Sequence, residues 1–103
     1  MHAVLVTFQS MLSLEDVEPA FSDHARALEA MPGLVCATWM YAGARLGSYQ
    51  VFADRWAAEQ YLGGNLFGQV KTNPAFTDFE IRHFEVVDSL SHFAETTRLT
   101  PRS

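Results

Sequence analysis

The chain is poor in cysteine and in basic residues, and each shortage excludes a class of protein. Cys36 is the single cysteine among 103 residues, so the chain can form neither an internal disulfide nor a thiolate-rich zinc or iron–sulfur site. Because Cys36 stands in an apolar run, we expect it to be a small buried hydrophobe. Lys and Arg number 7 against 12 Asp and Glu. Phosphate binding relies on basic side chains, so we expect no nucleic-acid partner and no membrane partner.

Long apolar runs are also missing. No stretch approaches the roughly 20 apolar residues that a membrane-spanning helix needs. The first six residues, MHAVLV, lack the basic region and the apolar core of a secretory signal. We therefore expect a cytoplasmic protein.

Aromatic residues, by contrast, are plentiful. Eight Phe, three Tyr and two Trp accompany a hydrophobic content of 49%, which is too apolar for a disordered chain. A domain of this size buries only about two-thirds of its unfolded surface. One small core therefore has little room for so many rings, and a second buried surface is expected.

The order of apolar patterns predicts a β-α-β-β-α-β chain, which is the ferredoxin-like α+β arrangement with a four-stranded antiparallel sheet. Ser13 and Asp54 are the expected helix caps, and Pro32-Gly33 is expected to end the first helix. Residues 1–91 are predicted to form one domain, and residues 92–103 a polar tail. The predicted strands are Ala3–Gln9, Leu34–Tyr41, Leu46–Phe52 and Phe76–Val87; the predicted helices are 13–31 and 54–62, with a short helical turn at 66–71.

The first two predicted strands are apolar on both faces. In the first, Val4, Val6 and Phe8 alternate with Leu5 and other uncharged residues. Two helices cover only one face of such a sheet, so the other face needs a partner. We therefore expect a homodimer in which two sheets close into an α+β barrel.

Several segments keep their order and approximate spacing across residues 31–91: Met31-Pro32-Gly33-Leu34, Trp39, Gly47–Phe52, Asp54, Ala58, Tyr61-Leu62, Phe84–Asp88 and Leu90-Ser91. Together they resemble a known family. This is the dimeric α+β-barrel superfamily of antibiotic-biosynthesis-type monooxygenases, and within it the YdhR-type branch of small monooxygenases. Two features depart from the family pattern: Cys36-Ala37-Thr38 stands where a basic residue is expected before the tryptophan, and the hairpin is shorter. Both would alter the pocket lining.

The resemblance implies oxidation of an activated phenolic, polyketide-like or quinol substrate without flavin, metal or haem. Such chemistry needs an aromatic-lined cavity, a few polar groups and a base that helps to form an enolate-like carbanion able to react with dioxygen. We expect no cofactor and, since no third ligand stands near His83 and Glu85 at a recognisable spacing, no metal.

Two residues are the candidate catalytic groups. His83, in the last strand, is the best candidate base, because imidazole accepts a proton near neutral pH; pairing with a carboxylate of a neighbouring strand is the competing interpretation. Tyr49 stands at the family-like position in the third strand, where it would supply a pocket hydroxyl. Tyr49 and Gln50 point to opposite faces of that strand, and the sequence leaves open which one shares the face of Trp39.

The candidate substrate-binding residues are aromatic or lie beside aromatic ones. Trp39 and Tyr41 share one face of the second strand, where cavity lining competes with core packing. His24 stands on the inward arc of the first helix. On the second helix, Trp56 and Tyr61 would cover a cavity or pack in the core. The candidate set is Trp39, Tyr41, His24, Gln50 and Trp56.

Three classes of function fit these residues. The first is the cofactor-independent monooxygenase. The second is a cyclase, isomerase or decarboxylating lyase on the same scaffold, since it stabilises a similar intermediate. The third is a non-catalytic binding module whose aromatic residues form only core and interface.

Overall fold

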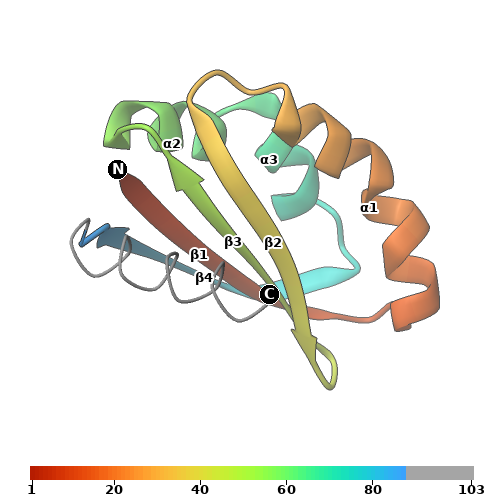
Figure 1. Cartoon of the computed structure of the whole chain (residues 1–103). Helices are drawn as coiled ribbons and strands as arrows, with labels where there is room; N and C mark the ends of the chain where they lie inside the picture. Colours follow the sequence, from red (N-terminus) through yellow and green to blue (C-terminus); the bar gives the residue numbers. More distant parts are fainter. Residues whose placement is uncertain (88–103) are drawn as a thin grey trace, which may run out of the picture.

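The computed structural model describes residues 1–87. Its elements follow the predicted order, with one helix more than the two that the sequence patterns indicate (Figure 1). The predicted tail at residues 92–103 lies outside the described part of the chain. The elements are β1 (His2–Ser10), α1 (Leu14–Glu29), β2 (Leu34–Ala42), β3 (Arg45–Phe52), α2 (Arg55–Leu62), α3 (Asn65–Lys71) and β4 (Phe76–Glu85).

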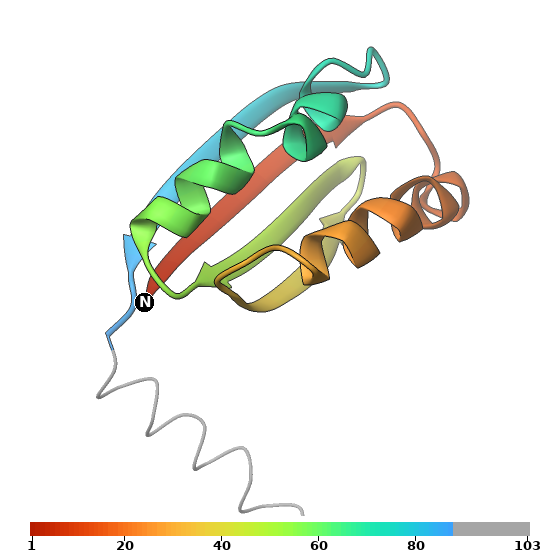
Figure 2. The same cartoon turned by 90° about the horizontal axis from the view of Figure 1, so that it is seen from above.

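The four strands form one antiparallel sheet in the order β2-β3-β1-β4. All three helices lie against the same face of this sheet (Figure 1). Seen from above, α1 runs along the β2 and β3 side, whereas α2 and α3 run over β1 and β4 (Figure 2). The predicted ferredoxin-like α+β fold is confirmed. We call the face under the helices the covered face and the other the open face.

Local chemistry explains where the helices begin and end. The Asp54 carboxylate accepts a hydrogen bond of 2.8 Å from the Ala57 backbone N–H, which confirms the predicted cap of α2. Ser13 occupies the cap position of α1, but its hydroxyl donates to Asp16 and not to the backbone. Gly33 follows α1 with φ of 87°, and a Cβ there would lie 2.7 Å from that of Ala57. The close approach of the two elements therefore requires glycine at this position.

Element ends differ from prediction by at most two residues. The last strand ends at Glu85 and not at Val87, and α1 ends at Glu29 and not at Met31. The predicted turn at 66–71 is a full short helix, α3. Gly63 and Gly64 separate it from α2, which lets two short helices cover one side of the sheet.

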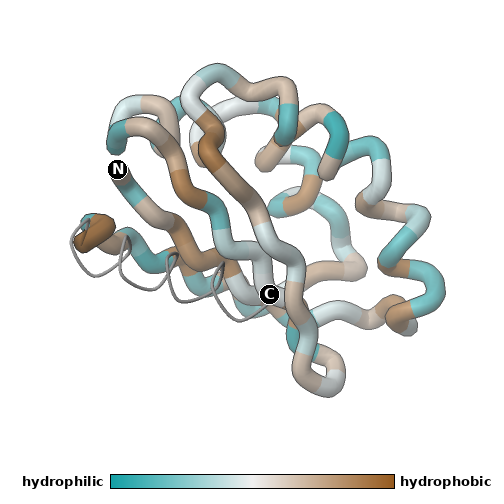
Figure 3. Tube along the Cα trace, viewed as in Figure 1, coloured by the Kyte–Doolittle hydropathy of each residue, from teal (hydrophilic) through white to brown (hydrophobic). Residues whose placement is uncertain are grey.

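The covered face carries the hydrophobic core. The helical pattern of α1 buries Val17, Phe21, His24 and Leu28, as its spacing predicts. The most hydrophobic stretches lie in the strands, and hydrophilic residues recur along the helices (Figure 3). Phe8 lies at the centre of a ring cluster, 4.9 Å from Phe79 between centroids. Further core residues are Val4, Val6, Leu46, Phe52, Ala57, Ala58, Tyr61, Phe67, Val70 and Phe76.

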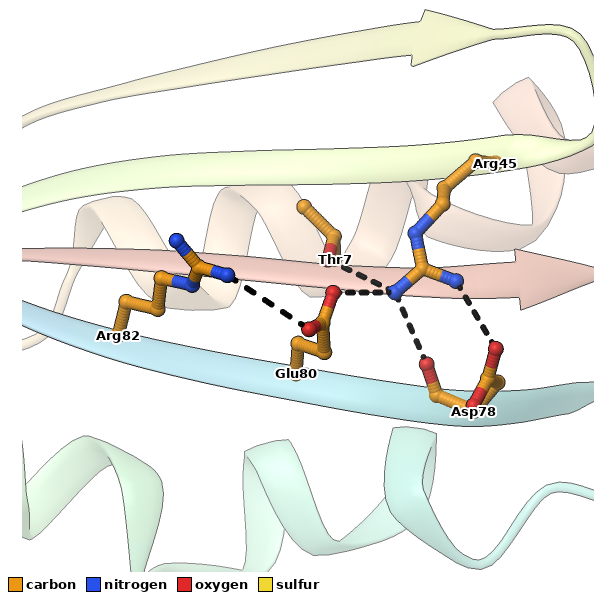
Figure 4. A network of polar contacts seen from close by, with 5 residues as sticks. All are labelled: Thr7, Arg45, Asp78, Glu80 and Arg82. Atoms are coloured by element: carbon orange, nitrogen blue, oxygen red, sulfur yellow. Dashed lines mark hydrogen bonds and ion pairs between the residues drawn. The ribbon is translucent and has the colours of Figure 1, made fainter.

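The open face is apolar at one end and polar at the other. The polar end is a network around Arg45, whose guanidinium donates to Thr7, to the side chain and backbone of Asp78, and to Glu80 (Figure 4). Arg82 approaches Glu80 at 3.8 Å. Exposed apolar side chains on or beside this face include Val35, Met40, Tyr49 and Phe84.

Cys36 lies on the open face and is exposed in the single chain. The prediction that it is a buried hydrophobe is therefore wrong for the isolated chain, because β2 is apolar on both faces and the pattern cannot tell which face the helices cover. Separately, no helix within residues 1–87 is long and apolar enough to cross a membrane.

Candidate functional site

The candidate site lies on the covered face, where α1 and the α2–α3 pair spread apart (Figure 2). Three hollows meet there. The outer groove, about 390 Å³, lies between α1 and β2, and the side cleft, about 470 Å³, lies between α1 and α3. The inner cavity, about 10 Å³, lies between them and the sheet. Phe21 lines all three, so it forms their common wall.

The inner cavity contains a buried polar pair. His24 Nε2 and the Tyr61 hydroxyl are 2.9 Å apart, which joins α1 to α2 by a hydrogen bond. Aromatic rings surround this pair: Trp39 stands edge-on to His24 at 5.8 Å between centroids, and Phe67 lies 5.4 Å from Tyr61. Two titratable groups are thus held inside the core, among aromatic rings.

Burial fixes both members of the pair in their neutral forms. It lowers the pKa of His24 below 6.5, and it raises the pKa of Tyr61 well above its ordinary value. At neutral pH, His24 is therefore an uncharged imidazole that can accept a proton. Tyr61 keeps its proton and can act as a hydrogen-bond donor.

The register of the β2–β3 hairpin shows which of Tyr49 and Gln50 shares the face of Trp39. Trp39 lies opposite Ser48, and Ala37 lies opposite Gln50, so Ser48, Gln50 and Trp39 share the covered face. Gln50 is 0% exposed and lines the inner cavity together with Ser48. Tyr49 points to the open face, away from this cavity.

His83 also lies away from the three hollows. It stands on the edge strand β4, with Nδ1 2.8 Å from His2 Nε2, while His2 Nδ1 lies 3.4 Å from Glu85 Oε1. Desolvation, followed by the positive charge of Arg55 and the His2 ring, lowers the pKa of His83, and Glu59 acts in the opposite direction. The structure therefore does not bring the two predicted catalytic residues, His83 and Tyr49, together.

The predicted substrate-binding residues are divided between the site and the surface. His24, Trp39 and Gln50 line the inner cavity, and Tyr41 lines the outer groove with an exposed ring. Trp56 is 66% exposed on α2 and lines none of the three hollows. The prediction that Trp56 points inward is wrong, because Ala57, Ala58 and Tyr61 alone form the buried side of this short helix.

Sequence reasoning missed the roles of Tyr61 and Ser48. The sequence pattern predicts only that Tyr61 covers a cavity or packs in the core, because its hydrogen-bond partner His24 stands 37 positions earlier in the chain. Ser48 follows from alternation once the parity of Gln50 is known, since residues two apart share a face. Among residues 1–87, no three His, Cys, Asp or Glu side chains are placed to hold a metal ion.

Comparison with protein families gives one match of nearly full length. The model of the family described as "Putative mono-oxygenase ydhR" matches residues 4–97. The matched region includes every strand and helix of the described chain except the start of β1.

Solved structures share the fold at low sequence identity. SnoaB from Streptomyces nogalater, a cofactor-independent oxygenase, superposes with a TM-score of 0.69 at 17% identity, covering 82% of this chain and 91% of that one. The haem degrader MhuD from Mycobacterium tuberculosis gives 0.66 at 18% identity, covering 84% and 96%. Identity this low supports the fold alone.

One characterised protein shares a shorter segment. S-methyl thiourocanate hydratase from a Variovorax species is 42% identical over 53 residues, which is 48% of this chain. The chain spans only 9% of the length of that protein. The shared segment is therefore a small part of the hydratase.

Proposed function

The chain belongs to the ydhR mono-oxygenase family, and from this premise we propose that it is a cofactor-independent monooxygenase. Its substrate is a small apolar aromatic molecule of the activated phenolic, polyketide-like or quinol class. The observation that carries the proposal is the neutral His24–Tyr61 pair, buried among aromatic rings beside a groove of about 390 Å³. A base in an apolar, aromatic-lined hollow is what such chemistry needs.

The outer groove suits a flat apolar ring. Phe21 and Trp39 stand with their ring centroids 5.2 Å apart and line both the groove and the inner cavity. Tyr41 stands at the mouth of the groove with an exposed ring. A substrate that packs against these rings gains area burial and aromatic contacts, and its reacting atoms are directed toward His24.

His24 acts as the base in this proposal. His24 accepts the substrate proton either directly or through the Tyr61 hydroxyl, which gives its proton to Nε2 as it takes one from the substrate and so stays protonated. The carbanion or phenolate that forms gives electrons to dioxygen. For a CH2 group the balance is CH2 + O2 → C=O + H2O. One oxygen atom enters the product and the other leaves in water, so the substrate supplies all four electrons.

This proposal does not use Tyr49 and His83. Both lie outside the three hollows, so they serve instead as control positions. Catalysis by either remains a prediction from the sequence alone.

A homodimer is part of the proposal. The open face carries Met40, Tyr49 and Phe84 as large exposed side chains, and Cys36 lies on the same face. Patches of this kind on a sheet face mark an interaction surface. Two copies that pair through this face form the barrel, and each keeps its own hollows on the helix side. A cytoplasmic location likewise stays a prediction.

A non-oxidative enzyme is the second candidate function. The 53-residue similarity to a hydratase favours it, because hydration is not an oxidation. A cyclase or isomerase would use the same base and the same groove. A non-catalytic module that binds small ligands is the third candidate, and it would need the groove but not the neutral His24–Tyr61 pair.

Oxygen uptake by metal-free and haem-free protein tests the proposal. With a panel of anthrones and hydroquinones, the wild-type chain should consume oxygen. Tyr61→Phe and His24→Gln should each lower kcat/KM by about 10²-fold, as expected for loss of a general base. His83→Gln is the matched control, because it removes an imidazole of the same type outside the hollows, and it should retain the wild-type rate.

Two results would contradict the proposal. If His83→Gln abolishes uptake and His24→Gln does not, the catalytic base lies at β4. If no panel member drives uptake while the same compounds are isomerised or cyclised, the second candidate function replaces the first.

A further inference from the structure

Gln50 carries an unpaired buried acceptor at the centre of the sheet. Its side-chain Nε2 donates to Ser48 Oγ, but Oε1 has no hydrogen-bond partner among residues 1–87. The residue lies in β3 opposite Val4 of β1 and Ala37 of β2, and it is 0% exposed. No other buried side-chain nitrogen or oxygen in the described part of the chain lacks a partner.

A buried acceptor without a partner, such as Gln50 Oε1, lowers the stability of the folded protein until a hydrogen-bond donor reaches it. A buried acceptor that is left without a hydrogen bond loses its contact with water and gains nothing in return. A leucine at this position would fill a similar volume without that penalty. The carboxamide is therefore costly to the empty protein, and a ligand that brings a donor recovers the cost.

The surroundings of Oε1 restrict the kind of donor. Gln50 lines the inner cavity with Ser48, His24 and Tyr61, and no carboxylate lines it in the described structure. An ammonium group would therefore enter without a counter-charge. A hydroxyl is neutral, donates to Oε1 and can also accept from a neighbouring hydroxyl. The cavity of about 10 Å³ has room for about one oxygen atom.

The outer groove supplies the rest of the ligand. Phe21 and Trp39 line both the groove and the inner cavity, so a ring that packs on them directs one substituent toward Gln50. The substituent that fits is a single hydroxyl on an aromatic ring. A water molecule has the same donor chemistry and is the competing occupant.

We propose that Gln50 Oε1 accepts a hydrogen bond from a phenolic hydroxyl of the ligand, so that the site selects hydroxylated aromatic molecules over methoxylated or unsubstituted ones. The inference rests on the proposed function, since it names the substrate class of the same site. It makes Gln50 a specificity-determining residue and gives no role to it in proton transfer.

Ligand binding without turnover tests this selection. Calorimetric titration under nitrogen should give 2-naphthol about tenfold tighter binding than 2-methoxynaphthalene, as expected for one hydrogen bond to a buried group. Gln50→Leu should bind both compounds equally. Gln60→Leu makes the same exchange at an exposed position of α2 and should keep the tenfold preference.

Thermal unfolding without ligand shows whether Gln50→Leu folds and whether the acceptor is costly. The variant should unfold at the wild-type temperature or above it, because it removes an unpaired acceptor. Lower stability together with retained 2-naphthol preference overturns the proposal. Equal binding of both compounds by the wild type also overturns it.

Failure of this inference is distinguishable from failure of the proposed function. Oxygen uptake by the wild type without any hydroxyl preference removes the role of Gln50 and leaves the monooxygenase. A hydroxyl preference that Gln50→Leu abolishes, with no uptake of oxygen, supports the role of Gln50 and removes the monooxygenase.

Discussion

The two faces of the sheet carry similar aromatic residues, but these residues lie in different surroundings. Under the helices, strand residues meet α1, α2 and α3, and the aromatic rings form a core with a polar pair inside it. On the open face, the same strands present Tyr49 and Phe84 beside an ion-pair network. Alternation along a strand assigns residues to faces, but the helices decide which face becomes interior. The same side chain therefore has very different energetic consequences on the two faces.

A matched pair of truncations should show the largest difference between the faces. Phe8, 1% exposed, contacts Phe21, Phe76 and Phe79, whereas Phe84 is 48% exposed on the open face. Phe8→Ala should lower the free energy of unfolding by about 3–5 kcal/mol, because it leaves a cavity in the core. Phe84→Ala should cost about 1 kcal/mol or less in the single chain.

Urea denaturation of dilute protein measures both values. Equal losses for Phe8→Ala and Phe84→Ala would mean that the open face is already buried at that concentration. The urea measurement is then repeated at high protein concentration. Only burial by a second chain makes the loss for Phe84→Ala depend on protein concentration.

A charge on the open face should prevent association. Tyr49 lies between Leu5 of β1 and Thr38 of β2 in the register, near the middle of this face. Tyr49→Glu should raise the dissociation constant of the dimer at least about 100-fold, because an unpaired carboxylate would have to be buried. Sedimentation should report two chains for the wild type and one for the variant.

Gln60→Glu is the control for that experiment, since it adds the same charge on the exposed side of α2. Dissociation by both variants would point to net charge and not to the open face. A wild-type chain that sediments alone at micromolar concentration would refute the homodimer.

The sequence predicts the strands and helices well because each has a local signal. The short run of β-branched and apolar residues in β1, the spacing of Val17, Phe21 and Leu28 in α1, and the Asp54 cap are all readable in short windows. The face of Gln50 depends instead on the two-residue loop at Gly43 and Ala44, and one residue more would have exchanged it with Tyr49.

The site itself depends on contacts that no short window contains. His24 and Tyr61 meet only because α1 and α2 pack on the same face of the sheet. The side chains of His83 and His2 are in contact because of the register of β1 with β4. The exposure of Trp56 follows from the shortness of α2, since eight residues bury only one narrow side. Residue type therefore identified several site members, but their grouping required the fold.

The buried imidazole should make stability depend on pH. The folded-state pKa of His24 lies below 6.5, its value in the unfolded chain. As the pH falls through 6.5, His24 binds a proton in the unfolded chain but not in the folded chain. The free energy of unfolding therefore decreases until the pH reaches the folded-state pKa. The slope from this one group is at most about 1.4 kcal/mol per pH unit.

Urea midpoints between pH 8 and pH 5 test this linkage. His24→Gln should flatten the slope in that range. His83→Gln should leave most of it, because His83 is exposed at the edge of the covered face. An unchanged slope in His24→Gln would show that the imidazole of His24 is protonated equally in both states.

The ion-pair network around Arg45 should give the smallest change in stability. It tests whether a partner chain covers the polar end of the open face. The Arg45 side chain is 29% exposed, and its partners Asp78 and Glu80 are 76% and 56% exposed. Exposed pairs of this kind contribute about 0–1 kcal/mol and weaken with salt. A double-mutant cycle with Arg45→Met and Glu80→Gln should therefore give a coupling free energy below about 1 kcal/mol in dilute protein.

The coupling free energy could also rise above this value at protein concentrations that favour the dimer and stay unchanged when salt is added. Such a result would mean that the partner chain shields the network from water. In that case the polar end of the open face belongs to the interface together with the apolar end.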